Sequence, residues 1–285
     1  MKNDDFGDRM KEYEGVEAQR KLMPLLPICV RLDGKGFSKF TKGLKRPYDD
    51  RMSRLMIDTT KALVQEANAL VGYTQSDEIS LIVYSPTRKS QVYFGGRIQK
   101  IVGDLAAFAS LYFNRELPYY LPEKKGKMPR FYCRVWNVPT KLEATNTILW
   151  REQDATKNSI SMAASHYYSH KQLHLKNGKD KQDMLMEKGV NWNDYPSFFK
   201  RGVFIRKEAV TRAFTSDELY RLPAKHQART NPDLQIERQE IREVDMPSFG
   251  KVKNRVEVLF EGAVPITEDE KINQIVNSIA FNETH

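Results

Sequence analysis

The stretch Ile28-Cys29-Val30-Arg31-Leu32-Asp33-Gly34-Lys35-Gly36-Phe37 decides the fold of this chain. It is an apolar run that ends in a carboxylate and two glycines, which is typical of a strand that runs into a loop. About 40 residues later, Gln75-Ser76-Asp77-Glu78 opens a second apolar run, from Ile79 to Tyr84. Asp is common in ordinary turns, but two such stretches together also fit a phosphoryl-transfer site with two metal ions.

The elements around these stretches are predicted to follow the order strand, helix, strand, strand, helix, strand. Apolar residues recur at helical spacing in one segment that starts near Asp49 or Asp50 and in another from about Gly95 to Asn114. Four other apolar runs predict strands over residues 25–32, 70–73, 79–84 and 131–135. This order is the split ferredoxin-like unit. We therefore predict an α+β fold with an antiparallel βαββαβ sheet, helices on one face, and a mostly helical C-terminal part.

This topology predicts where the acidic residues meet. The first and third strands of such a sheet are adjacent and antiparallel, so the end of the first strand, Asp33, lies beside Asp77 and Glu78. Mg²⁺ prefers carboxylate oxygens and completes its shell with waters and substrate phosphates. Two such ions can activate an attacking hydroxyl and stabilise a leaving oxygen. Asp33, Asp77 and Glu78 are therefore the candidate catalytic residues.

Composition narrows the class of protein. The chain has 285 residues, a formal charge of +9 and 29% charged residues, and a basic balance favours a polyanionic partner. It has neither an apolar run of membrane-spanning length nor the apolar core of a secretory signal at its first residues. Cys29 and Cys133 both sit in apolar runs, which predicts buried thiols in a reducing, cytoplasmic compartment.

The second half of the chain gives weaker signals. Residues 150–175 are predicted to be mostly helical, with Asp154 or Thr156 as the N-cap. Three histidines spaced four residues apart leave open a zinc site or a solvated, RNA-facing stripe: His166, His170 and His174. Residues 176–181 are expected to form a polar loop, whereas residues 198–206 and 255–260 are expected to be strands. Basic residues in two places are candidate RNA contacts: Lys124, Lys125, Lys127, Lys200 and Arg201.

The blocks Arg31-Leu32-Asp33-Gly34 and Gln75-Ser76-Asp77-Glu78 together resemble the tRNA-His guanylyltransferase family. Later blocks match as well: Phe131-Tyr132-Cys133-Arg134-Val135, Trp150-Arg151 with Asp154 and Asn158, and Lys200-Arg201-Gly202. The resemblance covers roughly residues 5–210. In that family a polymerase-like palm adds nucleotides to the 5′ end of tRNA in the 3′-to-5′ direction.

The resemblance implies a particular site. Two Mg²⁺ ions would be held by Asp33, Asp77 and the backbone carbonyl of Gly34, with Glu78 alongside. GTP, ATP or another nucleoside triphosphate would contact ten residues: Asp33, Gly34, Lys35, Gly36, Phe37, Ser38, Ser76, Asp77, Arg97 and Lys100. It further implies tRNA as the partner, bound through its acceptor stem and 5′ end, and a homotetramer. The expected domains are a palm over residues 5–138, a helical and strand domain over 139–215, and a C-terminal extension over 216–285.

Two departures from the family pattern bear on function. Tyr132 stands where the family usually has Asp, and Thr156 replaces a His that follows the Trp-Arg block in the eukaryotic enzymes. The chain thus resembles the bacterial, archaeal and viral guanylyltransferase-like branch, which implies template-dependent repair of tRNA 5′ ends. Three alternatives stay open: addition of G to tRNA-His, a palm-type nucleotide cyclase, and a non-catalytic RNA-binding protein.

Overall fold

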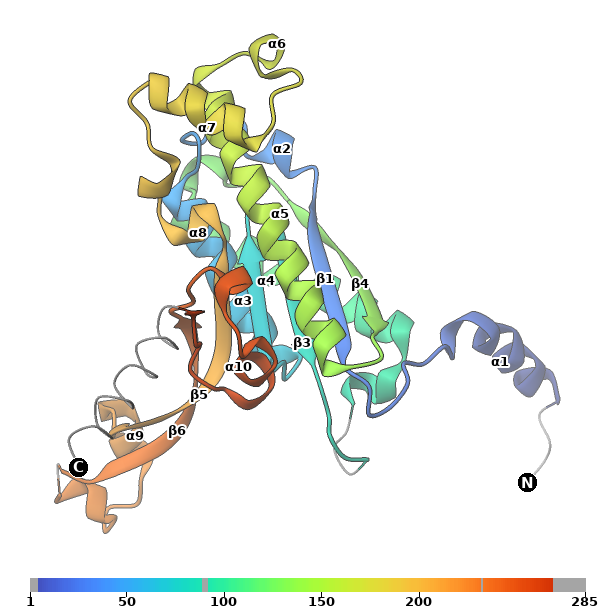
Figure 1. Cartoon of the computed structure of the whole chain (residues 1–285). Helices are drawn as coiled ribbons and strands as arrows, with labels where there is room; N and C mark the ends of the chain where they lie inside the picture. The colour runs from blue at the N-terminus through green and yellow to red at the C-terminus, as the bar shows by residue number, and fades with distance from the viewer. Residues whose placement is uncertain (1–4, 89–91, 232, 269–285) are drawn as a thin grey trace, which may run out of the picture.

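The computed structural model describes residues 5–88, 92–231 and 233–268 (Figure 1). Their strands form one antiparallel six-stranded sheet in the order β4-β1-β3-β2-β5-β6. The strands are β1 (Ile28–Lys35), β2 (Val71–Gln75), β3 (Glu78–Val83), β4 (Arg130–Asn137), β5 (Val203–Ala213) and β6 (Gln235–Val244). The first four have the order expected of a ferredoxin-like unit, so the predicted α+β fold is confirmed.

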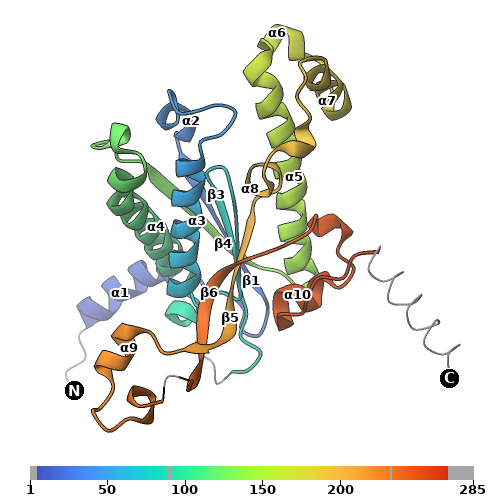
Figure 2. The same cartoon turned by 90° about the vertical axis from the view of Figure 1, so that its left-hand side faces the viewer.

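Two helices cover one face of the sheet, α3 (Asp50–Glu66) and α4 (Ile98–Tyr120) (Figure 2). Alternate residues of β1 point toward them, and these residues join the largest apolar core: Ile28, Val30 and Leu32. The side chain of Asp49 caps α3 by accepting a hydrogen bond from the backbone N–H of Arg51 at 3.1 Å. The helix predicted to start near Asp49 or Asp50 is therefore confirmed. The second predicted helix, α4, starts at Ile98 rather than near Gly95 and ends at Tyr120 rather than Asn114.

The long helix α5 (Lys141–Tyr167) crosses the opposite face of the sheet (Figure 1). Its residues Ala144 and Ile148 pack with Cys29 of β1 and Ile82 of β3 in a second apolar core. The helix starts nine residues before the predicted start at residue 150, because the side chain of Thr140 provides the N-cap by accepting from the backbone N–H of Glu143. The predicted caps at Asp154 and Thr156 are wrong.

Short helices make up much of the remaining chain. They are α1 (Asp5–Ala18), α2 (Phe37–Phe40), α6 (His170–Leu173), α7 (Gly178–Glu187), α8 (Ser197–Lys200), α9 (Ser216–Arg221) and α10 (Arg255–Glu261). Single 3₁₀ turns are η1 (Tyr93–Gly96), η2 (Pro122–Lys124), η3 (Trp192–Asp194), η4 (Gln227–Arg229) and η5 (Phe249–Lys251). Among the described residues, no helix is both long and apolar enough to cross a membrane.

Three expectations for the C-terminal half are corrected. The polar loop expected over residues 176–181 contains the start of α7, because Asn177 and Asp180 form a capping box. The strand expected over 198–206 starts only at Val203, since Pro196 begins the short helix α8. The strand expected over 255–260 is the helix α10, whose adjacent Val258 and Leu259 are both buried. Packing against the rest of the fold overrides the β propensity of that segment.

The C-terminal strands extend the palm sheet rather than building one of their own. β5 pairs with β2 from Val71↔Arg206 to Thr74↔Val203, and β6 pairs with β5 along its whole length. The predicted domain boundaries at residues 138 and 215 fall between β4 and α5 and just before α9. Division of the chain at those points remains a prediction.

Candidate active site

The two acidic stretches meet at one end of the sheet. In the β1–β3 register Asp33 stands opposite Glu78, and the backbone N–H of Gly34 donates to the carbonyl of Asp77 at 3.1 Å. The juxtaposition expected from the strand order is therefore present. Asp33 and Glu78 lie on the face that α5 crosses, because the alternate residues Leu32 and Ile79 are buried on the α3 and α4 side.

Arginines hold the carboxylates of Asp33 and Glu78. Arg31 donates from Nε to Oδ1 of Asp33 at 3.1 Å and from Nη2 to Oε1 of Glu78 at 2.5 Å. Arg134 pairs with Oδ2 of Asp33, and Arg151 donates from Nη2 to Oε2 of Glu78 at 2.5 Å. Because Arg134 is 59% exposed, its side chain can leave Asp33 without opening the core.

Asp77 forms no ion pair with a cation within the described part of the chain. Ser76 donates from its hydroxyl to Oδ1 of Asp77 at 3.2 Å. Burial raises the pKa of the Asp77 carboxyl, and the nearby charges of Glu78 and Asp33 raise this pKa further. A divalent cation would relieve both the desolvation and the repulsion between the acids.

The ligands fit Mg²⁺ rather than a metal that needs a full protein cage. Among the described residues, no three His, Cys, Asp or Glu side chains are grouped as a metal site. Two carboxylates from Asp33 and Asp77, with the carbonyl of Gly34, leave positions for water and phosphate oxygens, which is the usual pattern for Mg²⁺. When bound, Mg²⁺ would lower the pKa of an attacking hydroxyl and stabilise charge on phosphate oxygens.

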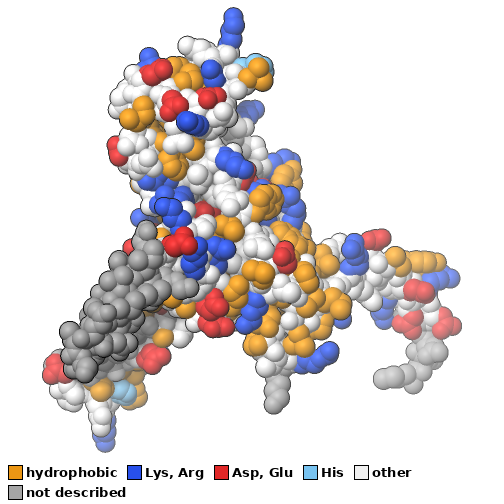
Figure 3. Space-filling view, in the orientation of Figure 1, with side chains coloured by type: hydrophobic (Ala, Val, Ile, Leu, Met, Phe, Trp, Pro, Cys, Tyr) orange, Lys and Arg blue, Asp and Glu red, His pale blue; other side chains and the backbone are white. Residues whose placement is uncertain are grey.

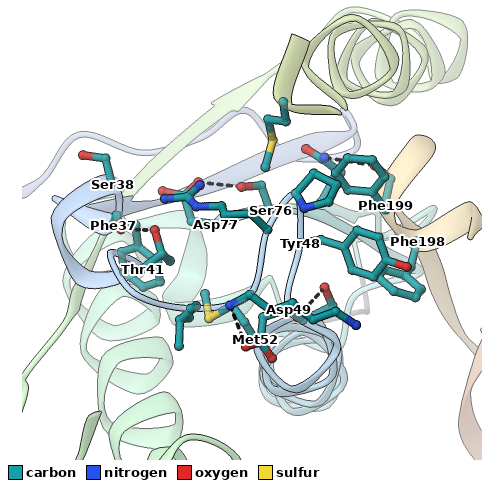
Figure 4. Close-up of a pocket in the computed structure, with 18 of the residues that line it drawn as sticks. Phe37, Ser38, Thr41, Tyr48, Asp49, Met52, Ser76, Asp77, Phe198 and Phe199 are labelled. Carbon is teal, nitrogen blue, oxygen red and sulfur yellow. Dashed lines mark hydrogen bonds between the residues drawn. The ribbon is translucent and has the colours of Figure 1, made fainter. Parts of the chain in front are cut away.

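Asp77 borders a cavity of about 410 Å³ (Figure 4). The loop predicted to bind the nucleotide contributes Gly34, Gly36, Phe37 and Ser38 to its lining, whereas Asp33 and Lys35 are not among the lining residues. Figure 4 shows an aromatic wall across from Asp77 and Ser76, made by Tyr48, Phe198 and Phe199. The volume lies within the usual range for small-molecule sites.

Asp77 also lines a second cavity, of about 550 Å³. It shares Arg46, Gln75, Ser76, Asp77 and Met162 with the first cavity. Its remaining lining is polar and comes from β3 and one side of α5: Glu78, Asn158, Ser161, Ser165 and His166. The two cavities therefore adjoin, and Asp77 lines both of them.

The sequence did not indicate several of the residues in these walls. The rings of Tyr48 and Phe199 pack at a tilt, with 4.8 Å between their centroids, although the two residues are far apart in the chain. Arg46 lines both cavities. The one local pattern that could have indicated this wall is the aromatic pair Phe198-Phe199 beside the basic pair Lys200-Arg201, and that segment is predicted from the sequence to be a strand.

Arg97 and Lys100, the predicted triphosphate contacts, lie at the opposite end of the sheet. The N–H of Ile98 bonds to the carbonyl of Arg20 at the start of α4, whereas Lys124, just after its end, bonds to the carbonyl of Lys42. α4 has 23 residues, so its two ends are about 33 Å apart at 1.5 Å per residue. Within one chain, Arg97 and Lys100 therefore do not reach Asp77.

The predicted RNA contacts divide into two groups. The loop of Lys124, Lys125 and Lys127 lies at the catalytic end of the sheet, and Lys125 and Lys127 are exposed. Lys200 differs, because it is 9% exposed, bonds to the carbonyl of Asn193 and lies 5.6 Å from the Trp192 ring centroid. Its assignment as a phosphate contact is corrected, since the ammonium is buried in the fold.

The remaining sequence candidates are placed as follows. The three histidines do not share one helix, because α5 ends at Tyr167; His166 is on α5, His170 is on α6 and His174 follows α6. Thr156 donates its hydroxyl to the carbonyl of Glu152 within α5 at 3.0 Å. Cys29 and Cys133 are buried free thiols, as predicted.

The chain is similar in sequence and fold to known proteins. The profile of the tRNAHis guanylyltransferase (Thg1) family matches residues 7–139. An uncharacterized protein of Acanthamoeba polyphaga mimivirus, R259, is 31% identical over 232 residues, which cover 73% of this chain and 79% of that protein.

Two solved structures of bacterial tRNA(His) guanylyltransferase (Thg1)-like protein are similar in fold and sequence. The complex with ATP has a TM-score of 0.67 and 41% identity, covering 71% of this chain and 87% of that chain. The complex with GTP has a TM-score of 0.67 and 32% identity, covering 87% of this chain and 95% of that chain. Together with the paired acidic stretches, these matches show that the chain is a nucleotidyltransferase that belongs to the tRNAHis guanylyltransferase family.

Proposed function

We propose that this enzyme repairs the 5′ end of tRNA by adding the nucleotide that the opposite strand of the acceptor stem specifies. The observation that carries the proposal is the position of Asp77, which lines two adjoining cavities and accepts a backbone hydrogen bond from Gly34, the residue after Asp33. One cavity suits a nucleoside triphosphate, as the ATP and GTP complexes of the bacterial relatives support. The other leaves room for the end of an RNA strand.

In this proposal the residues of the chain have separate tasks. Asp33, Asp77 and the carbonyl of Gly34 would hold two Mg²⁺ ions, and Glu78 keeps Arg31 and Arg151 in place. The first step transfers a nucleotidyl group from ATP or GTP to the tRNA 5′-phosphate and releases pyrophosphate. In the second step the 3′-hydroxyl of the incoming triphosphate attacks that activated phosphate, and the mononucleotide leaves.

We also propose that the working form is an oligomer in which one copy completes the site of another. Arg97 and Lys100 are about 35 and 30 Å from the far end of α4 at 1.5 Å per residue, and that end lies near the candidate catalytic residues of their own chain. If they bind a triphosphate, they do so at the site of a second copy, which agrees with the homotetramer that the family resemblance predicts. A mixture of an Asp77→Asn variant with an Arg97→Ala, Lys100→Ala variant then recovers activity that neither variant has alone.

The test of the main proposal uses tRNA that lacks its first nucleotide and carries a 5′-label. Each of the four triphosphates is offered with ATP and Mg²⁺ against each of the four template bases, in tRNAs with His and non-His anticodons. We expect the complementary nucleotide to be added in every case, because pairing with the template selects it. Addition of G alone, in tRNA-His alone, would establish the guanylyltransferase alternative, and a cyclic nucleotide product would establish a cyclase.

A further inference from the structure

Two exposed aromatic side chains lie on the face of the sheet that α5 crosses, the face on which Asp33 also lies. Tyr132 of β4 is 55% exposed and Trp150 of α5 is 53% exposed. Neither residue lines the two cavities beside Asp77. Neither is needed to fill an apolar core, so their exposure calls for another explanation.

The β1–β4 register places Tyr132 directly opposite Asp33. Side chains alternate along a strand, so Arg130, Tyr132 and Arg134 project from the same face of β4. Their neighbours Phe131 and Cys133 are buried on the other face. The ammonium of Lys35 lies 5.5 Å from the centroid of the Tyr132 ring. Tyr132 is therefore an aromatic surface bordered by three cations, one strand away from Asp33.

Trp150 approaches the same acid from α5. Its ring centroid lies 5.7 Å from the guanidinium carbon of Arg31 and 4.5 Å from that of Arg151. Arg31 in turn donates to Asp33. Figure 3 shows basic and hydrophobic side chains next to one another over this part of α5 and β4. Tyr132 thus lies one strand from Asp33, and Trp150 packs against Arg31, which donates to the same acid.

This pattern is the one that single-stranded nucleic acid needs. Bases stack on aromatic rings whatever their identity, and nearby cations neutralise the phosphates between them. We propose that Tyr132 and Trp150 form a stacking site for unpaired nucleotides of RNA, with Arg130, Arg134 and Lys35 as phosphate contacts. The proposal rests on the proposed function, since the RNA end beside Asp33 is the end that reacts.

Unpaired RNA suits the site better than a free nucleotide does. The aromatic rings lie outside the cavities, and the exposed loop of Lys125 and Lys127 continues the basic surface beyond Arg130. A strand several nucleotides long can contact both rings and this loop. A single triphosphate cannot span them while it also fills the cavity at Asp77.

The experiment measures binding of two RNA hairpins, one with a blunt acceptor end and one with four unpaired nucleotides at that end. Four variants test the rings: Tyr132→Ala, Tyr132→Phe, Trp150→Ala and Trp150→Phe. Tyr119→Ala is the control, since Tyr119 is 81% exposed and lies on α4, on the opposite face of the sheet. We expect each Ala variant to raise the Kd for the unpaired end by about 5- to 150-fold. The Phe variants and the control keep the wild-type Kd.

Three readouts separate stacking from a structural role. The wild-type tryptophan fluorescence falls when the unpaired end binds, and this change is absent in Trp150→Phe. The KM for tRNA rises in Tyr132→Ala, whereas the KM for the triphosphate is unchanged. Equal losses for blunt and unpaired hairpins, or no loss in either Ala variant, would overturn the stacking site. Because binding is measured without catalysis, a failure of nucleotide addition would count only against the proposed function.

Discussion

Two glycines in the loop proposed to bind the nucleotide allow side-chain packing and backbone conformation to be compared as constraints on this site. Gly36 has a φ of +70°, a region that L side chains rarely adopt, but a Cβ there would meet nothing within 4 Å. Gly34 is in strand β1, where any residue is acceptable to the backbone. A Cβ on Gly34, however, would lie 2.3 Å from Cδ2 of Phe37. Backbone preference therefore predicts that Gly36→Ala destabilises the protein more. Side-chain packing predicts instead that Gly34→Ala destabilises it more.

The structure favours packing. The ring of Phe37 would have to move by about 1 Å to reach an ordinary contact distance. Three rings oppose that movement, because Phe40, Phe113 and Phe131 have centroids 5.2, 5.5 and 5.2 Å from that of Phe37. Overpacking of this kind costs about 1–3 kcal/mol. At Gly36 the left-handed conformation costs about 1–2 kcal/mol, partly offset by the stiffer unfolded chain.

The assay is urea unfolding followed by circular dichroism, together with the kcat/KM for the triphosphate. We expect Gly34→Ala to lower the free energy of unfolding more than Gly36→Ala and to reduce kcat/KM by about tenfold or more, since the first cavity is displaced. Adding Phe37→Leu to Gly34→Ala should restore part of the stability, because leucine is smaller than the ring. A larger loss for Gly36→Ala, or no recovery with leucine, would refute the packing argument.

Three further predictions concern titration and charge. Burial raises the pKa of the Glu152 carboxyl above its ordinary value of 4.5. The protonated group therefore favours the folded state below pH 4.5, and this contribution is lost as the pH rises through the raised pKa. Over that pH window the Tm of Glu152→Gln should rise relative to the Tm of the wild type. Burial also raises the pKa of Cys29 to about 11 and that of Cys133 to about 12, so a thiol reagent at pH 8 should label neither until the chain is unfolded in urea. Removing both exposed lysines, Lys125 and Lys127, should weaken RNA binding. The slope of log K against log salt concentration should fall in magnitude by about 0.7–0.9 per lost phosphate contact. Lys200→Met should leave that slope unchanged.

Much of the first half of this fold could be predicted from local patterns. The apolar periods of α3 and α4 and the short strands between them are sufficient to order the sheet. The order of the strands then brings Asp33 to Glu78 with no further information. A motif match does not show how far Arg97 lies from the acids. The length and direction of α4 place the start of that helix, and Arg97 with it, away from Asp33 and Asp77.

The walls of the site could not be predicted in the same way. Tyr48 meets Phe198 and Phe199 only after β5 has joined the sheet beside β2. The arginines at Asp33 and Glu78 come from β1, β4 and α5, so their pairing depends on three elements that are far apart in sequence. In the C-terminal part, caps at Thr140 and Asn177 decide where helices begin, and neither stands out among the many polar residues nearby.

The C-terminal segment has a physical link to the site despite its distance in sequence. Glu152 is buried on α5 and accepts a hydrogen bond from the backbone N–H of Phe249 at 2.8 Å. Phe249 is fully buried and packs against Phe204 of β5, which carries the sheet onward from β2. Glu152 thus connects α5, through Phe249, to β5, the strand that follows Phe198 and Phe199 in the chain. Arg151, the neighbour of Glu152 on α5, donates to Glu78 and to Asp154. Loosening residues 245–250 would therefore shift the candidate catalytic carboxylate of Glu78 as well as reduce stability.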